Sequence, residues 1–437
     1  MHLQRKKKHI LALSSIVLFL LFAGCVGQEE EIETITETIT EPQEAVIIRF
    51  MGWGAGATEV ENYEKMIAAF REENPHIIVK YEVVTQQLHE NVLASFGAGV
   101  APDIFYMDSQ WAPVFMDKGV LYPMDDLTTP AVIGQYYDYL LAPFKGADGK
   151  VYGLPKDWSM LQLYYNKDLL SQAGWTTPPD TWDDLVTCAK AVTSATKKPG
   201  LCLYDGNFNR FVPVATSNGA PEPWFASAAD AGWFDNTTVV DSLKFYIKMI
   251  KDGRGAANPW LALPADVGAG WLGDAFGSEE VGMTISGNWA IPFLDGTFLD
   301  FEYDTDWGIA PIPKGSAGRA TMAYTVALGI SADTEHPAEA WKFVEFLLGK
   351  DGQTELVVKM GQTLPSIKGL ENHPDLWPQH AATLSHEYDN ITVFVWGPQG
   401  AALEGDFSTI MADAMKGQIA VSGAIDNMKK AVEDAFA

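Results

Sequence analysis

The sequence has little cysteine, little histidine and little positive charge for its length. It holds 3 Cys and 8 His among 437 residues, and these residues nowhere cluster at the spacing of a metal site. Lys and Arg number 30 against 57 Asp and Glu, which gives a formal net charge of −27. Nucleic-acid binding needs a basic surface, so this excess of acid argues against such a partner. It also repels phosphate and polyanionic substrates unless a local pocket overrides it.

Internal repeats and a membrane-length apolar run are also lacking. Without repeats, nothing supports a repeat-built surface adhesin. An apolar run at residues 11–23, "LALSSIVLFLLFA", follows a basic segment and is too short for a comfortable membrane span, which is typical of a secretory signal. It ends in "LFAGC", which resembles the lipobox of bacterial and archaeal lipoproteins. We therefore expect residues 1–24 to be a signal peptide and Cys25 to be lipidated.

Residues 25–45 carry acidic side chains, a Thr repeat and no base. Such a segment repels itself and has little to bury, so it predicts an extended tether. A tether is useful only when its other end is anchored, and this supports lipidation of Cys25 independently. Export also separates the chain from cytosolic ATP and NAD, and we expect no cofactor.

Two cysteines remain in the globular part, Cys188 and Cys202. In an oxidising compartment a disulfide closing this loop would add about 3 kcal/mol of stability. Two buried free thiols are the alternative. We expect the disulfide.

Hydrophobic patterning predicts an α/β fold. Strands at 45–54, 76–84 and 102–108 alternate with helices at 58–75 and 87–99, an order typical of a doubly wound parallel sheet. The carboxyl ends of its strands would bring the loops at 53–59 and 108–111 together. Further along, residues 150–155 and 161–166 are predicted to form a strand pair.

Five segments, in this order, resemble the extracellular solute-binding proteins of carbohydrate ABC transporters, specifically the maltose/trehalose-type group. The most specific is "GKVYGLPKDWSMLQLYYNKDLLSQAG" at 149–174. The others lie at 97–127 ("PDIFYMDSQW"), 178–186 ("PPDTWDDLV"), 282–290 ("GMTISGNWA") and 330–353 ("PAEAWKFVEFLLG").

This resemblance implies a two-lobed periplasmic-binding-protein-like fold of the class II type, with discontinuous lobes joined by hinge strands. The N-lobe would comprise residues 46–157 and 310–349, and the C-lobe residues 158–309 and 350–437. A sugar would close the cleft, and the lobes would then meet permease subunits of an ABC importer. The implied protein is a monomer, anchored outside the cytoplasm, and not an enzyme.

Sugars present hydroxyls at their edges and C–H groups on their faces, so carboxylates, amides and aromatic rings recognise them. The resemblance and the strand ends point to ten candidate ligand-binding residues. They are Trp53, Glu59, Asp108, Trp111, Asp157, Trp158, Trp289, Tyr324, Gln362 and Trp396. Glu59 and Asp108 could instead serve as helix caps, and Trp111 could simply pack. Ser159 stands where a close trehalose/maltose pattern has an acidic residue, which leaves the sugar open.

Two other functions compete. Acidic cleft residues would also suit a polyamine, and a peptide is a further non-sugar ligand. An exported glycoside hydrolase would need two carboxylates across the cleft, roles that Asp108 and Asp157 could fill. Nothing in the sequence indicates that either residue serves as a catalytic acid. We also see no basic loop that would bind a phosphate or a sugar acid. A neutral sugar is the favoured ligand.

Overall fold

A computed structural model of the chain describes residues 45–54 and 57–437. The predicted signal peptide, Cys25 and the tether up to residue 44 lie outside the described residues. Within them, no helix is both long and apolar enough to cross a membrane. The strands are β1 (Val46–Gly52), β2 (Ile77–Val83), β3 (Ile104–Asp108), β4 (Leu154–Met160), β5 (Gln162–Asn166), β6 (Leu201–Cys202), β7 (Leu261–Ala262), β8 (Met283–Ser286), β9 (Trp307–Ala310), β10 (Ala320–Ile330) and β11 (Asn390–Val393).

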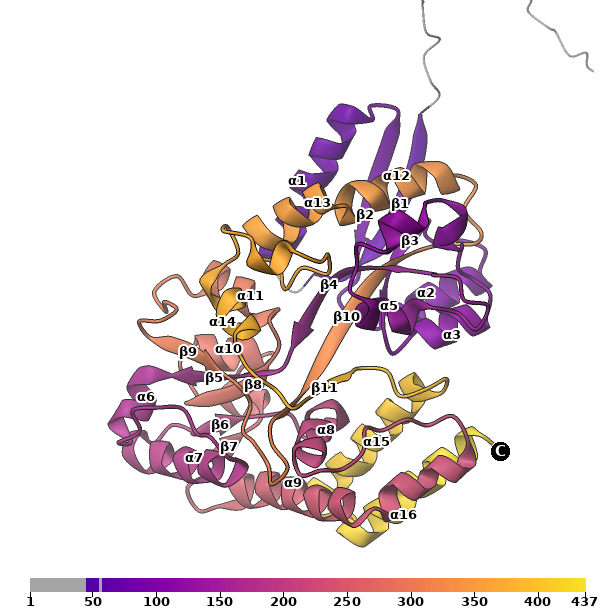
Figure 1. Ribbon diagram of the computed structural model, residues 1–437. Helices are drawn as coiled ribbons and strands as arrows, with labels where there is room; N and C mark the ends of the chain where they lie inside the picture. Colours follow the sequence, from indigo (N-terminus) through magenta and orange to yellow (C-terminus); the bar gives the residue numbers. More distant parts are fainter. Residues whose placement is uncertain (1–44, 55–56) are drawn as a thin grey trace, which may run out of the picture. The chain divides into compact units, whose positions relative to one another are not determined.

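Helices cover these strands (Figure 1). They are α1 (Ala57–Glu73), α2 (Leu88–Gly97), α3 (Ala112–Asp117), α4 (Pro130–Ile133), α5 (Asp138–Leu141), α6 (Lys167–Gln172), α7 (Trp182–Thr196), α8 (Phe208–Ser217), α9 (Thr237–Gly255), α10 (Leu272–Gly277), α11 (Ala290–Thr297), α12 (Pro337–Leu348), α13 (Lys350–Gln353), α14 (Pro378–Leu384), α15 (Gly400–Met415) and α16 (Val421–Ala435).

The first sheet has the strand order β11-β10-β3-β1-β2, and β4 also pairs with β10. Strand β1 is parallel to both β2 and β3, so the predicted parallel arrangement is confirmed for these strands. Strand β10 runs antiparallel to β3 and β4. Helices α1 and α12 pack beside this sheet (Figure 1).

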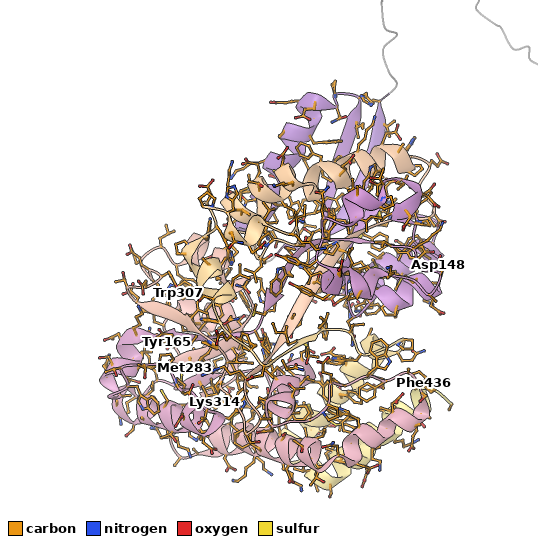
Figure 2. All side chains as sticks on the ribbon, viewed as in Figure 1. Asp148, Tyr165, Met283, Trp307, Lys314 and Phe436 are labelled. Atoms are coloured by element: carbon orange, nitrogen blue, oxygen red, sulfur yellow. The ribbon has the colours of Figure 1, made fainter. Side chains whose placement is uncertain are left out.

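The second sheet has the strand order β7-β6-β8-β5-β9. Strand β5 lies between β8 and β9 and is antiparallel to both, with Tyr165 opposite Met283 and Gly308. Figure 2 shows Tyr165, Met283 and Trp307 close together in this part of the molecule. The aromatic residues of β5 and β9 therefore serve mainly to pack this sheet.

The predicted pairing of residues 150–155 with 161–166 is wrong. Strand β4 pairs with β10 in the first sheet, whereas β5 pairs with β8 and β9 in the second. Only Leu161 separates the two strands, and one residue is too few for a hairpin turn. The chain therefore passes straight from one sheet into the other. Leu161 is held to β10, since its N–H donates to Met322 O at 3.0 Å and its carbonyl accepts from Thr321 Oγ1 at 2.8 Å.

Each sheet has its own hydrophobic core. Strand β10 contributes to both, because Met322 packs with the second-sheet core while Leu328 packs with the first. Leu356 and Ile367 also pack with the first core, although they fall within the range 350–437 that the resemblance assigns to the C-lobe. The exact lobe boundaries stay a prediction.

The expected disulfide is wrong. Cys188 and Cys202 are free and fully buried, and burial raises the pKa of each thiol to about 12. Successive residues of a strand point to opposite faces of a sheet. Leu201 packs with Cys188 in the core beneath α7, so Cys202 points to the other face, where it packs with Tyr164. The sheet separates the two sulfur atoms.

Candidate functional site

A cavity of about 270 Å³ is lined by residues of the first sheet, by neighbouring loops and helices, and by Trp289, which follows β8 of the second sheet. This volume is close to the lower end of the range for small-molecule sites, about 300–1,000 Å³. Its lining residues are Trp53, Glu59, Asp108, Lys156, Asp157, Ser159, Trp289, Tyr324, Val326, Gln362 and Thr363.

Three neighbouring strands of the first sheet supply much of the lining. Val326 of β10 lies opposite both Asp108 at the end of β3 and Asp157 of β4. Tyr324, two residues before Val326 on β10, lies opposite Ser159 of β4. Because residues two apart share a face of a strand, this register places all five side chains on the same face.

Asp108 is held by its own loop. Its Oδ1 accepts from the Gln110 backbone N–H at 3.0 Å and from Ser109 Oγ at 3.4 Å. Its backbone N–H donates to Nε2 of His89 at 3.1 Å. Burial lowers the pKa of His89 to about 3, so this ring is neutral and can accept. Burial raises the pKa of Asp108 to about 7, against the opposing effect of its hydrogen bonds.

Lys156 and Asp157 form a buried ion pair. Lys156 Nζ lies 2.5 Å from Asp157 Oδ2, and the two residues are 4% and 5% exposed. The ammonium also lies 4.9 Å from the centre of the Tyr106 ring. Burial alone would lower the pKa of Lys156, but Asp157, Tyr63 and Glu59 together raise it. The cavity therefore contains an ammonium group next to its carboxylates.

Trp289 follows the turn at the end of β8 and is half-buried. Its ring meets Tyr324 edge-on, with centroids 5.2 Å apart and planes at 88°. The indole also folds over Gly287, where an added Cβ would lie only 2.1 Å from Cζ3 of Trp289. Only glycine leaves room for the ring at this point of the turn.

Several buried polar atoms at the cavity have no hydrogen-bond partner among the described residues. They are Tyr324 Oη, Gln362 Oε1 and Thr363 Oγ1. Buried polar atoms in folded proteins are nearly always paired. The Trp289 ring and these unpaired atoms together suit a small ligand with hydroxyl groups. Within residues 45–54 and 57–437, no cluster of His, Cys, Asp or Glu could hold a metal ion.

Comparison with known sequences identifies the chain's family. Residues 56–354 match the family described as bacterial extracellular solute-binding protein. The chain belongs to this family. The multiple sugar-binding protein of Streptococcus mutans is 26% identical over 362 residues, covering 79% of this chain and 81% of that protein.

Solved structures share the fold of this solute-binding protein. Maltose-bound MalE3 of T. maritima is 22% identical, with a TM-score of 0.76 over 89% of this chain and 100% of that one. The GacH receptor of Streptomyces glaucescens, solved unliganded and with acarbose, is 23% identical, with a TM-score of 0.77 over 90% and 99%. The predicted two-lobed α/β fold is thereby confirmed.

The structure brings seven of the ten candidate residues of the solute-binding protein to one cavity. They are Trp53, Glu59, Asp108, Asp157, Trp289, Tyr324 and Gln362. Glu59 lies in the first turn of α1, where a carboxylate also complements the helix dipole. Trp53 follows β1 and meets Tyr106 edge-on at 5.4 Å.

The other three candidates lie elsewhere. Trp158 alternates with Asp157 and Ser159 along β4, so it faces away from the cavity, and its Nε1 donates to Pro365 O at 3.1 Å. Trp396 is 0% exposed in the second-sheet core, with its ring 4.8 Å from Phe208.

Trp111 is half-buried and stacks on the neutral ring of His89, with centroids 5.1 Å apart. These contacts give the three tryptophans packing roles in this structure.

Four lining residues of the solute-binding protein were not among the ten candidates: Lys156, Ser159, Val326 and Thr363. Ser159 could have been found from the sequence, because residues two apart in a strand share a face and Asp157 was already a candidate. Lys156 and Asp157 both reach the cavity although they are adjacent, and the register of β4 against β10 shifts beside them, between Val326 and Ala327. Such an irregularity leaves no signal in a single sequence.

Proposed function

We propose that this protein captures a neutral carbohydrate, an oligosaccharide such as maltose, a maltodextrin or trehalose, and delivers it to an ABC importer. The observation that carries the proposal is one cavity with an aromatic ring beside unpaired acceptors. Trp289 supplies a surface for the C–H face of a sugar, and Gln362 Oε1 and the carboxylates supply acceptors for its hydroxyls.

The charge of the cavity argues for a ligand without negative charge. Three carboxyl groups, from Glu59, Asp108 and Asp157, face a single cation, Lys156, and that cation already pairs with Asp157. A phosphate or sugar acid would meet net repulsion at this site. Hydroxyl groups can donate to the carboxylates at no such cost.

A polyamine is the second candidate, because the same excess of carboxylate would hold ammonium groups. Trp289 and Tyr324 could also bind a cation through their ring faces. The orphan hydroxyls of Tyr324 and Thr363 are better matched by a polyol, which both donates and accepts.

We propose that the protein binds without catalysis. Asp108 and Asp157 lie on β3 and β4, which flank β10, so their backbones are two strand spacings apart, about 10 Å. A retaining glycosidase holds its carboxyl groups about 5–5.5 Å apart and an inverting one about 6.5–9.5 Å apart, so this spacing opposes a retaining mechanism only. In addition, Asp157 is occupied by Lys156.

The sequence and the family support a proposal for the cellular setting. We propose an extracytoplasmic monomer held at the membrane through a lipid on Cys25, with residues 25–45 as its tether. Binding would close the cleft, and the lobes would then engage the permease. Mass spectrometry of the membrane-bound protein, with a Cys25→Ala variant released to the soluble fraction, tests the anchor.

Calorimetric titration tests the ligand class. The panel comprises maltose, maltotriose, trehalose, cello- and xylo-oligosaccharides, a sugar phosphate and spermidine. We expect saturable binding of at least one neutral sugar and no binding of a sugar phosphate. Binding of spermidine alone would overturn the carbohydrate assignment, and release of shorter sugars during incubation would overturn the assignment as a non-enzyme.

A further inference from the structure

Asn288 lies between Gly287 and Trp289 in the turn after β8. Its side chain is 0% exposed, and it is not part of the cavity lining. Its Oδ1 accepts from the Met160 N–H at 3.1 Å, and its own backbone N–H donates to Ser159 Oγ at 2.7 Å. The residue before Trp289 is therefore bound twice to β4, a strand of the other sheet.

The amide nitrogen of Asn288 reaches a third element, α14. Its Nδ2 donates to Thr383 Oγ1 at 3.0 Å and lies 3.4 Å from Nδ1 of His380. Burial lowers the pKa of His380 to about 4, so the ring is neutral. Its Nε2 lies 3.0 Å from Gly361 O and must carry the proton there, which leaves Nδ1 to accept from Asn288.

The network ends at the cavity wall. Gly361 directly precedes Gln362 and Thr363, which both line the cavity and both carry an unpaired buried oxygen. Gly361 itself has a φ of +67°, and an added Cβ would lie 2.1 Å from the Trp377 ring. The backbone that His380 holds is thus confined on its other side as well.

We propose that Asn288 is a positioning residue that fixes three walls of the cavity against one another: Trp289, the β4 segment at Ser159, and the Gln362–Thr363 segment. The inference rests on the proposed function, because it takes the cavity as the carbohydrate site. A site whose walls are held in place before binding loses less conformational freedom when the ligand arrives. Without Asn288, the ligand itself must order each wall when it binds, and this ordering lowers the affinity.

The test compares Asn288→Ala with two further variants of the full chain. Thr383→Val removes one of the two contacts of the Asn288 amide nitrogen on α14, together with the Thr383 hydrogen bond to Gln379 O, and keeps the contact with His380 and the links to β4. Thr284→Ala is the matched control: Thr284 is 1% exposed on β8 and donates to Cys202 O at 2.9 Å, away from the cavity. Its loss removes a buried hydrogen bond of the same strand without touching the network.

Two readouts separate positioning from general stability. The first is acrylamide quenching of Trp289 fluorescence without ligand. The Trp289 signal of each protein is the difference between its fluorescence and that of the same protein carrying Trp289→Phe. The second is affinity for the sugar found by titration. We expect Asn288→Ala to increase quenching of Trp289 and to weaken binding about tenfold. Thr383→Val should change both readouts less and in the same direction, and Thr284→Ala should change neither.

A loss of melting temperature in Asn288→Ala with unchanged Trp289 quenching would overturn the inference. If that variant does not fold, Thr383→Val decides by the same two readouts, and unchanged values would overturn it equally. If no sugar binds the wild-type protein, the proposed function fails, whereas the ligand-free quenching still decides the role of Asn288.

Discussion

Replacing Trp289 with alanine removes the aromatic wall of the cavity. The ring is half-buried and contacts Tyr324 edge-on at 5.2 Å, so part of its surface is free to cover a ligand. Stacking and burial of one ring against a ligand contribute about 1–3 kcal/mol. The dissociation constant for the sugar should therefore rise about 5- to 150-fold.

Calorimetric titration of wild-type and variant protein with the sugar that binds measures this change. Trp271→Ala is the matched control, because Trp271 is also half-buried and meets Phe293 at 4.7 Å, yet it does not line the cavity. Far-UV circular dichroism checks that both variants fold. Equal affinity in Trp289→Ala and wild type, or an equal loss in both variants, would refute the placement of the ligand against Trp289.

Three further predictions concern charge and cysteine. The folded pKa of Asp108, about 7, lies above its ordinary value of 3.8, so ionising it costs stability as pH rises through this window. Asp108→Asn should therefore raise the melting temperature at pH 8 and change it little near pH 4; a pH-independent difference would contradict this. Lys156→Met leaves Asp157 buried and unpaired and should lower the unfolding free energy by about 3–5 kcal/mol in urea, whereas Lys150→Met removes a lysine from an exposed pair and should leave the unfolding free energy nearly unchanged. A reducing agent should leave the melting temperature unchanged, because the thiols of α7 and β6 are free; a fall would show a disulfide after all.

Residues at the ends of parallel strands could be placed from the sequence. The alternation of strands and helices fixes which edge of a doubly wound sheet faces a ligand. Asp108 at the end of β3, Trp53 after β1 and Trp289 after β8 follow from that rule, and the structure puts all three at one cavity.

Residues inside strands could not be placed, because their facing depends on register. Trp158 lies beside Asp157 in sequence, yet its neighbours Leu364 and Met160 belong to a separate cluster on the far side of β4. Trp396 suits a stacking role by type alone, but its burial depends on Phe208, far away in the chain.

The prediction of a disulfide between the two cysteines was wrong for the same reason. A loop of suitable length between Cys188 and Cys202 says nothing about which face of β6 the second sulfur takes. Leu201, Cys202 and Leu203 alternate between two cores, and a one-residue difference in register would have reversed the outcome.

Strand β10 also bears on how the protein unfolds. It packs into both hydrophobic cores and pairs with β3, β4 and β11. Opening either core would also disturb the packing of this strand in the other core, so we expect both halves to melt together. The described chain from residue 57 onward should therefore lose its structure in a single cooperative transition rather than lobe by lobe.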